Sequence, residues 1–342
     1  MSTDNLAKIA QQMVAPGKGI LAADESSGTI QKRLDSINVE STEENRRAYR
    51  ELLFTTEGIE EYISGVILFD ETLRQSAANG TNFGALLASR GILPGIKVDK
   101  GAKDLAFAPG EKVTEGLDGL RERLAEYVSL GAKFTKWRAV ITIGEGIPSA
   151  YCIDANAHGL ARYAALSQEA GLVPIVEPEV LMDADNTIEV CEEVTNEALE
   201  SVFHALHVHR VSLEGMILKP NMVISGKGCT TQAGVGEVAE ATVRSLTRNV
   251  PAAVPGICFL SGGQSDAVAT AHLNAMNAMG PHPWELSFSY GRALQAPALK
   301  GWGGDAANAP LAQRLFLHRC KCNGAARTGA YEDAMEGEVA AA

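Results

Sequence analysis

The chain has 342 residues, of which 46% are hydrophobic and 21% are charged, and its formal net charge is −12. This apolar fraction excludes wholesale disorder, and the acidic balance excludes a protein that binds nucleic acid through bulk positive charge. No run of roughly 18 apolar residues predicts a helix that crosses a membrane. The cysteines are scattered, and the Cys320–Cys322 pair lacks the second pair of a zinc site. We therefore expect a cytoplasmic protein with reduced thiols and no bound metal.

Residues 3–14 predict an amphipathic helix that begins at Thr3 or Asp4, and not a signal peptide. Beyond it, short apolar runs alternate with longer helical patterns. The runs span residues 19–24, 65–70, 95–99, 134–138, 173–179, 215–219, 256–261 and 285–290. The helical patterns span residues 42–54, 117–130, 155–170, 187–206, 237–246 and 266–279. Apolar runs without polar alternation are typical of parallel strands that are buried on both faces.

This alternation predicts an α/β protein with a single (β/α)8 TIM barrel over residues 1–325. A doubly wound dinucleotide-binding sheet is the alternative, but no Gly-x-Gly-x-x-Gly turn follows any of the runs. Residues 326–342 are small and acidic, which predicts a mobile tail or one that is laid over the surface.

Lys219 ends one of the apolar runs, Gly215–Lys219, and Pro220 follows it. Barrel enzymes carry their sites at the carboxyl ends of the strands, and buried lysines are rare unless they are paired or functional. Burial and neighbouring cations favour a neutral amine, which can attack a ketone to form a Schiff base. The alternative is a structural lysine that is paired with Glu177 or Glu179.

Glu177 and Glu179 share one face of their run and are expected beside Lys219. Schiff-base chemistry needs a group that protonates a departing hydroxyl and then acts as a base, which one of two paired carboxylates can do. A structural ion-pair cluster with the lysines explains the same residues equally well.

Two segments are suited to phosphate, because each leaves a run and leads into a helix: residues 260–265 and residues 289–292, the second with Arg292. A second anion cluster is predicted from Lys97 and residues 26–33, with solvated helix charges as the alternative for Lys32 and Arg33. His204, His207 and His209 are expected to be surface histidines and not metal ligands.

Several motifs at these positions resemble class I (Schiff-base) fructose-bisphosphate aldolases over residues 3–322. They include KGILAADESSGTIQKRL, TEENRRAYRELL, GVILFDETL, GIKVDKG, FTKWRAV, VPIVEPEVL, EGMILKPNMV, GICFLSGGQS, SFSYGRALQ and LKGWGG. The resemblance implies that Lys219 forms the Schiff base, with Glu177 as acid and base and Asp24, Lys136, Arg138 and Glu179 around it. It implies a C1 phosphate site of Ser261, Gly262, Gly263, Ser289, Gly291 and Arg292. It places Ser26, Thr29, Arg33 and Lys97 toward the C6 phosphate.

The activity that the resemblance implies is the reversible cleavage of fructose 1,6-bisphosphate into dihydroxyacetone phosphate and glyceraldehyde 3-phosphate. It implies a sugar-phosphate ligand, a homotetramer, and no metal, cofactor, nucleic acid or membrane partner. Another Schiff-base barrel, such as a transaldolase, is the enzymatic alternative, although two phosphate clusters favour a bisphosphate. A scaffold homologue without activity is the other alternative, although Asp24, Glu177, Lys219 and Arg292 are all present.

Members of this family from eukaryotes end in a tyrosine that moves the C3 proton of the substrate. Residues 338–342 contain no tyrosine, and Tyr331 is the tail residue with suitable chemistry. We expect that this proton moves through Glu177 or solvent.

Overall fold

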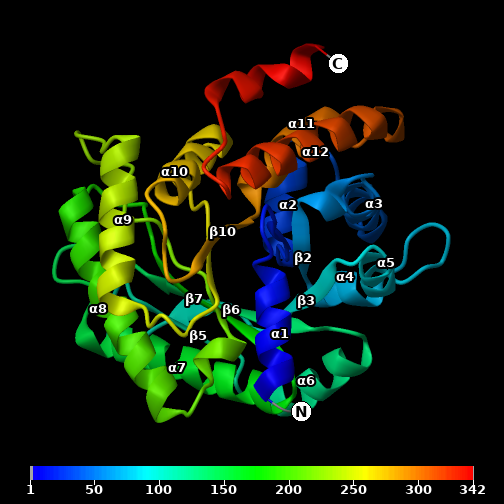
Figure 1. The fold of residues 1–342 in the computed structure, drawn as a ribbon. Helices are drawn as coiled ribbons and strands as arrows, with labels where there is room; N and C mark the ends of the chain where they lie inside the picture. The colour runs from blue at the N-terminus through cyan, green and yellow to red at the C-terminus, as the bar shows by residue number, and fades with distance from the viewer. Residues whose placement is uncertain (1–2, 342) are drawn as a thin grey trace.

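The computed structural model describes residues 3–341, whose parallel strands close into a barrel (Figure 1). The barrel strands are β1 (Gly19–Ala23), β2 (Ile63–Leu68), β3 (Leu93–Lys97), β6 (Phe134–Ile141), β7 (Val173–Val180), β8 (Ile217–Leu218), β9 (Gly256–Phe259) and β10 (Glu285–Tyr290). They pair in this order, and β10 pairs with β1 to close the ring. Each predicted apolar run overlaps one of these strands, and the predicted (β/α)8 fold is confirmed.

The helices surround this barrel, and each predicted helical pattern overlaps one of them. They are α1 (Thr3–Met13), α2 (Ser27–Asp35), α3 (Glu43–Phe54), α4 (Asp70–Arg74), α5 (Phe83–Ser89), α6 (Leu120–Ser129), α7 (Ala150–Glu169), α8 (Ile188–Val208), α9 (Val235–Asn249), α10 (Asp266–Ala278), α11 (Arg292–Trp302) and α12 (Ala309–Ala326). Short 3-10 helices lie at Ile59–Glu61, Leu213–Gly215 and Ala306–Asn308, and a longer one spans Asp333–Ala341. An antiparallel hairpin of β4 (Ala102–Asp104) and β5 (Lys112–Thr114) was not predicted, because each strand has only three residues and those of β4 are exposed.

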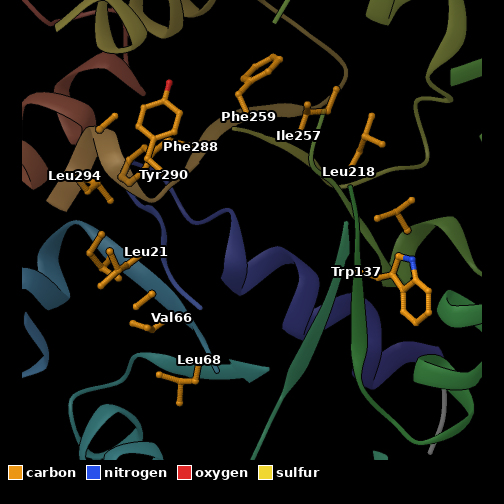
Figure 2. Close-up of a cluster of buried hydrophobic side chains, with 14 of the residues drawn as sticks. Leu21, Val66, Leu68, Trp137, Leu218, Ile257, Phe259, Phe288, Tyr290 and Leu294 are labelled. Atoms are coloured by element: carbon orange, nitrogen blue, oxygen red, sulfur yellow. The ribbon is translucent and has the colours of Figure 1, made fainter. Parts of the chain in front are cut away.

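Alternate side chains of the strands point to opposite sides of the barrel wall. One set, which includes Leu21, Trp137, Leu218, Phe259 and Tyr290, is buried in a large cluster between the strands and the helices (Figure 2). Because both sides of each strand are covered, the strands read in the sequence as continuous apolar runs.

The other set fills the interior of the barrel and packs against the N-terminal helix α1. Ile20, Phe134, Ile175 and Ile217 belong to this cluster, together with Leu6, Ala10 and Met13 of α1. A β-carbon on Gly95 would lie 2.2 Å from the ring of Phe134, so a glycine there makes room for that ring. The interior of the barrel on the side of α1 is therefore a packed apolar layer.

Positions further along the same strands, on the same face, carry charge instead of apolar groups. Asp24 lies four residues after the interior residue Ile20. Three further charged residues lie two residues after an interior residue of a strand: Lys136 after Phe134, Glu177 after Ile175 and Lys219 after Ile217. Because side chains alternate with a period of two, these charged groups point into the barrel above the apolar layer.

The segment after α12, for which a mobile tail or one laid over the surface was predicted, contacts the barrel and α12 through polar groups. Arg327 is buried and donates hydrogen bonds to main-chain carbonyls that include that of Leu286, 2.5 Å away. Tyr331 is 6% exposed, and its hydroxyl donates to Glu336 over 2.8 Å. Both Glu336 oxygens lie 2.6 Å from the buried guanidinium of Arg319 in α12. Polar contacts from the barrel thus hold a segment that has little apolar surface of its own to bury.

Candidate active site

A cavity of about 380 Å³ opens at the carboxyl ends of the strands, and every predicted site residue lines it. These residues are Asp24, Ser26, Thr29, Arg33, Lys97, Lys136, Arg138, Glu177, Glu179, Lys219, Ser261, Gly262, Gly263, Ser289, Gly291 and Arg292. They come from seven of the barrel strands or from the segments that follow them. The parallel arrangement brings these ends together, as the barrel prediction requires.

Asp24, Lys136, Glu177 and Lys219 form a chain of alternating charges at the base of the cavity. Lys136 Nζ lies 2.7 Å from Asp24 Oδ2 and 3.3 Å from Glu177 Oε2. Glu177 Oε1 lies 3.1 Å from Lys219 Nζ. Each of the three residues nearest the centre, Lys136, Glu177 and Lys219, has a side chain that is no more than 5% exposed. Lys219 is therefore paired with the carboxylate of Glu177. This contact is expected of a structural ion pair, and it is also expected of a catalytic lysine beside its acid and base.

This network fixes the protonation of Asp24, Glu177 and Lys136 at neutral pH. Burial alone raises the pKa of Asp24, but Lys136 and Lys219 outweigh it and lower that pKa to about 2. Burial is likewise outweighed at Glu177, where Lys136, Lys219 and Arg138 hold the pKa below its usual range. For Lys136, burial opposes the charge, whereas Asp24 and Glu177 raise its pKa above the ordinary value. Both carboxyl groups are ionised and Lys136 is protonated, because opposite charges surround each of them.

Two further ion pairs flank the chain of charges, one further along β6 and β7 and the other at the end of β3. Arg138 bonds to Glu179 Oε2, so Glu179 contacts this guanidinium and not Lys219, beside which it was expected. Lys97 Nζ lies 2.9 Å from Asp99 Oδ1, and the Asp99 side chain is 3% exposed. The cations that line the cavity are thus held in place before a ligand arrives.

The two segments predicted to bind phosphate lie side by side and are linked by Arg292. The loop of residues 260–265 leads into α10, whose N-cap, Ser265, accepts a hydrogen bond from Val268 N. Arg292 is the first residue of α11, and its guanidinium donates to the carbonyl of Gly262 in the other loop. The buried hydroxyl of Ser289 has no hydrogen-bond partner within residues 3–341. A phosphate in this corner would find a guanidinium, a free hydroxyl and a helix N-terminus.

Ser26 and Thr29 lie at the start of α2, which begins just after β1, and Arg33 lies in its last turn. The Ser26 and Thr29 hydroxyl oxygens are 3.2 Å apart. Burial lowers the pKa of Arg33, Glu25 counteracts that effect, and Arg292 lowers it further. Arg33 therefore lies within electrostatic reach of Arg292, and the two predicted anion clusters adjoin at this residue.

A buried polar cluster behind the cavity joins the loop after β1 to α11. Arg50 of α3 lies 2.7 Å from Glu25 Oε2, and Gln295 of α11 donates to the carbonyl of Ala22 over 2.7 Å. Gln295 also donates to Glu25 Oε1 over 3.1 Å. Asp24 precedes Glu25 in the chain, and Arg292 lies one helical turn before Gln295. These contacts therefore fix the position of Asp24 relative to that of Arg292.

Sequence reasoning missed several residues that line the cavity: Glu25, Asp99, Met182, Asp183 and Lys227. Asp99 ended a predicted run, so its position was a signal that went unused. Lys227 lies in the loop after β8, away from any strand end, and nothing in its local sequence indicates the cavity.

His204 and His207 of α8, and His209 just after it, do not lie in this cavity. His209 Nδ1 is 2.8 Å from the carbonyl of Ala205 on its own helix, and its ring packs edge-on against that of His158. Among residues 3–341, no three His, Cys, Asp or Glu side chains are grouped as a metal site would require. Within the same range, no helix has the length and apolarity to cross a membrane.

Fold and cavity together define the class: a (β/α)8-barrel enzyme with a buried lysine–carboxylate network at the carboxyl ends of its strands. Comparison with known proteins narrows this class. The family model "Fructose-bisphosphate aldolase class-I" matches residues 5–342. The chain belongs to the class I fructose-bisphosphate aldolase family.

Relatives in distant organisms match over nearly their whole lengths. A probable fructose-bisphosphate aldolase class 1 of Xanthomonas campestris pv. campestris is 62% identical, over 97% of this chain and 100% of the relative. The cytosolic fructose-bisphosphate aldolase 6 of Arabidopsis thaliana is 56% identical, over 99% of this chain and 95% of the relative. A solved structure of the Plasmodium falciparum aldolase, in complex with TRAP and a small-molecule inhibitor, has a TM-score of 0.95 and 51% identity, covering 96% of this chain and 95% of that one.

Proposed function

We propose that this enzyme reversibly cleaves fructose 1,6-bisphosphate into dihydroxyacetone phosphate and glyceraldehyde 3-phosphate through an imine on Lys219. The observation that carries the proposal is the 3.1 Å contact between Lys219 Nζ and Glu177 Oε1, inside a cavity that also holds the phosphate-suited loops. Membership of the aldolase family supports the choice of substrate.

Imine formation starts with the transfer of a proton from Lys219 to Glu177, which frees the amine to attack the C2 carbonyl of the substrate. The loss of the Lys219 charge removes one of the cations that lower the pKa of Glu177, so Glu177 holds the proton more readily at this stage. A proton of the attacking nitrogen passes to the C2 oxygen, which gives the carbinolamine. Glu177 then returns its proton to the C2 hydroxyl, which departs as water and leaves the protonated imine. Lys136, 3.3 Å from Glu177 Oε2, stabilises the carboxylate that results.

Cleavage of the C3–C4 bond follows, because the protonated imine accepts the electron pair of that bond. The C4 hydroxyl loses its proton as the aldehyde forms, and Asp24 is the ionised carboxylate that lies beside Lys136 to receive it. Glyceraldehyde 3-phosphate departs, and an enamine remains on Lys219. A proton then enters at C3 through Glu177 or solvent, and hydrolysis of the imine releases dihydroxyacetone phosphate.

Tyr331 takes no part in this route. Its hydroxyl donates a hydrogen bond to Glu336 beside α12. Tyr331 is not one of the residues in the described range that line the cavity. This arrangement supports assigning the C3 proton to groups inside the barrel.

The proposal is tested with the unmodified chain. Incubation with fructose 1,6-bisphosphate should yield equal amounts of the two triose phosphates. Borohydride added with dihydroxyacetone phosphate should fix a label on the peptide that contains Lys219. Labelling of Lys97 or Lys136 instead, or cleavage without any trapped adduct, would overturn the assignment.

Arg292 should contribute strongly to binding of the C1 phosphate, because its guanidinium can contact a dianion through two hydrogen bonds. Loss of such a contact costs on the order of 2–4 kcal/mol, so Arg292→Ala should lower kcat/KM by about 30- to 1000-fold. The loss should be similar for fructose 1-phosphate, which keeps the C1 phosphate. Steady-state kinetics on both sugars provide the measurement, with the surface variant Arg248→Ala as control. An equal loss on a sugar that lacks the C1 phosphate would contradict this role.

Cleavage should not depend on a metal ion, because the protonated imine supplies the electron sink that a metal supplies in other aldolases. Activity after dialysis against excess EDTA should therefore match that of an untreated sample. Loss of cleavage on chelation, followed by recovery with zinc or cobalt, would contradict this expectation.

We further propose a cytoplasmic location and a homotetrameric assembly. The location is supported by the Arabidopsis relative that is named cytosolic, and the assembly by the resemblance to the family. Light scattering on the purified protein measures the mass of the assembly, and a dimer or monomer would contradict the proposal.

A further inference from the structure

Lys227 lies directly over the loop that is suited to phosphate after β9, although it belongs to the loop after β8. A β-carbon built on Gly263 would lie 2.4 Å from Lys227 Nζ and 2.3 Å from its Cε. Lys227, Gly263 and Arg292 all line the same cavity. A second cation thus stands beside the corner that Arg292 and Ser289 form.

The backbone of Lys227 is held in place by the loop after β7. Lys227 N donates to the carbonyl of Met182 over 2.8 Å, Gly226 N to that of Asn186 over 2.9 Å, and Gly228 N to that of Ala184 over 2.9 Å. The side chain beyond this fixed backbone is 45% exposed. Its ammonium group can therefore change partners through side-chain rotation alone.

Two weak contacts occupy this corner in the structure. Lys227 Nζ lies 2.5 Å from Asp183 Oδ1, and the Asp183 side chain is 63% exposed. An ion pair that is exposed to this degree contributes little, about 0–1 kcal/mol. Gly263 N donates to the thioether sulfur of Met182 over 2.9 Å, and a thioether is a weak acceptor. A phosphate oxygen is a much better acceptor for both donors.

We propose that Lys227 is a further phosphate ligand in the loop of Ser261, Gly262 and Gly263. Asp183 holds its ammonium while the site is empty, and the Met182 sulfur occupies the Gly263 N–H until phosphate displaces it. The proposal rests on the proposed function, since it adds a ligand to the C1 phosphate site of the same cavity. Two cations, Lys227 and Arg292, then bind the C1 phosphate of the substrate.

The test compares Lys227→Met with Asp183→Asn, using fructose 1-phosphate as substrate and inorganic phosphate as competing inhibitor. Lys227→Met should raise both the KM and the inhibition constant of phosphate by about tenfold, the usual effect of losing one charge-assisted hydrogen bond to an anion. It should raise KM by a larger factor than it lowers kcat. Asp183→Asn should lower both constants, because it removes the competitor of the phosphate. Lys8→Met, on the exposed face of α1, is the matched control.

The proposal is overturned if Lys227→Met leaves the phosphate inhibition constant unchanged. It is also overturned if Asp183→Asn raises KM as much as Lys227→Met does, since the ion pair would then only support the loop. Calorimetric titration of the unmodified chain and of Lys227→Met with phosphate measures the same affinity without catalysis. Failure of the proposed function would appear separately, as phosphate binding by a chain that cleaves no sugar phosphate.

Discussion

Replacing Lys219 with alanine should abolish borohydride trapping of dihydroxyacetone phosphate and reduce cleavage of fructose 1,6-bisphosphate to the background level. The amine is the atom that bonds to C2 in the proposed route, so no other group can supply the electron sink. Its surroundings are fixed, because Nζ is buried and lies 3.1 Å from Glu177 Oε1. Mass spectrometry of the trapped protein and a coupled assay of triose phosphate provide the two measurements.

Lys219→Ala leaves a space and removes one of the two cations that pair with Glu177, so a second variant guards against a general loss of structure. Lys219→Met keeps the length of the side chain and cannot form an imine. Both variants should keep the circular dichroism spectrum of the unmodified chain. Trapping on either variant would show that a different lysine is the nucleophile.

Glu177→Gln should lower kcat by about 10²- to 10⁴-fold, the range expected for loss of a general acid and base. The amide cannot take the proton of Lys219 or return it to the C2 hydroxyl, although it has almost the same shape. Trapping should still label Lys219, but its rate should fall together with kcat, because imine formation itself uses Glu177. Rapid-mixing experiments with dihydroxyacetone phosphate measure that rate.

Glu169→Gln is the matched control, since Glu169 pairs with Arg121 on the surface, where its side chain is 59% exposed. Glu179→Gln gives a closer comparison. Glu179 pairs with Arg138 and not with Lys219, so the fall in kcat should be smaller than for Glu177→Gln. If Glu177→Gln retained the trapping rate of the unmodified chain, the acid and base would have to be another residue.

The strands, the barrel and most of the cavity could be predicted from the sequence, because the signals for them lie in short segments of neighbouring residues. Strands that are buried on both faces leave uninterrupted apolar runs, and polar residues end them. A barrel brings the carboxyl ends of all its strands together, so a residue such as Lys219 or Glu177 needs only its place in the run to be assigned to the cavity. The motif resemblance then supplied the roles of these residues.

Only the tertiary structure decided which groups touch. Glu179 was expected beside Lys219 but contacts Arg138, and Lys136 bridges Asp24 and Glu177 from a third strand. Lys227 reaches the loop of residues 260–265 from another loop, and Arg319 pairs with Glu336 in the segment after α12, a contact that composition does not predict. Ion pairs and hydrogen bonds depend on the positions of side-chain ends to within about 1 Å. The periodicity of a sequence fixes the face of a strand on which a residue lies, but only the packing of the whole barrel fixes those positions.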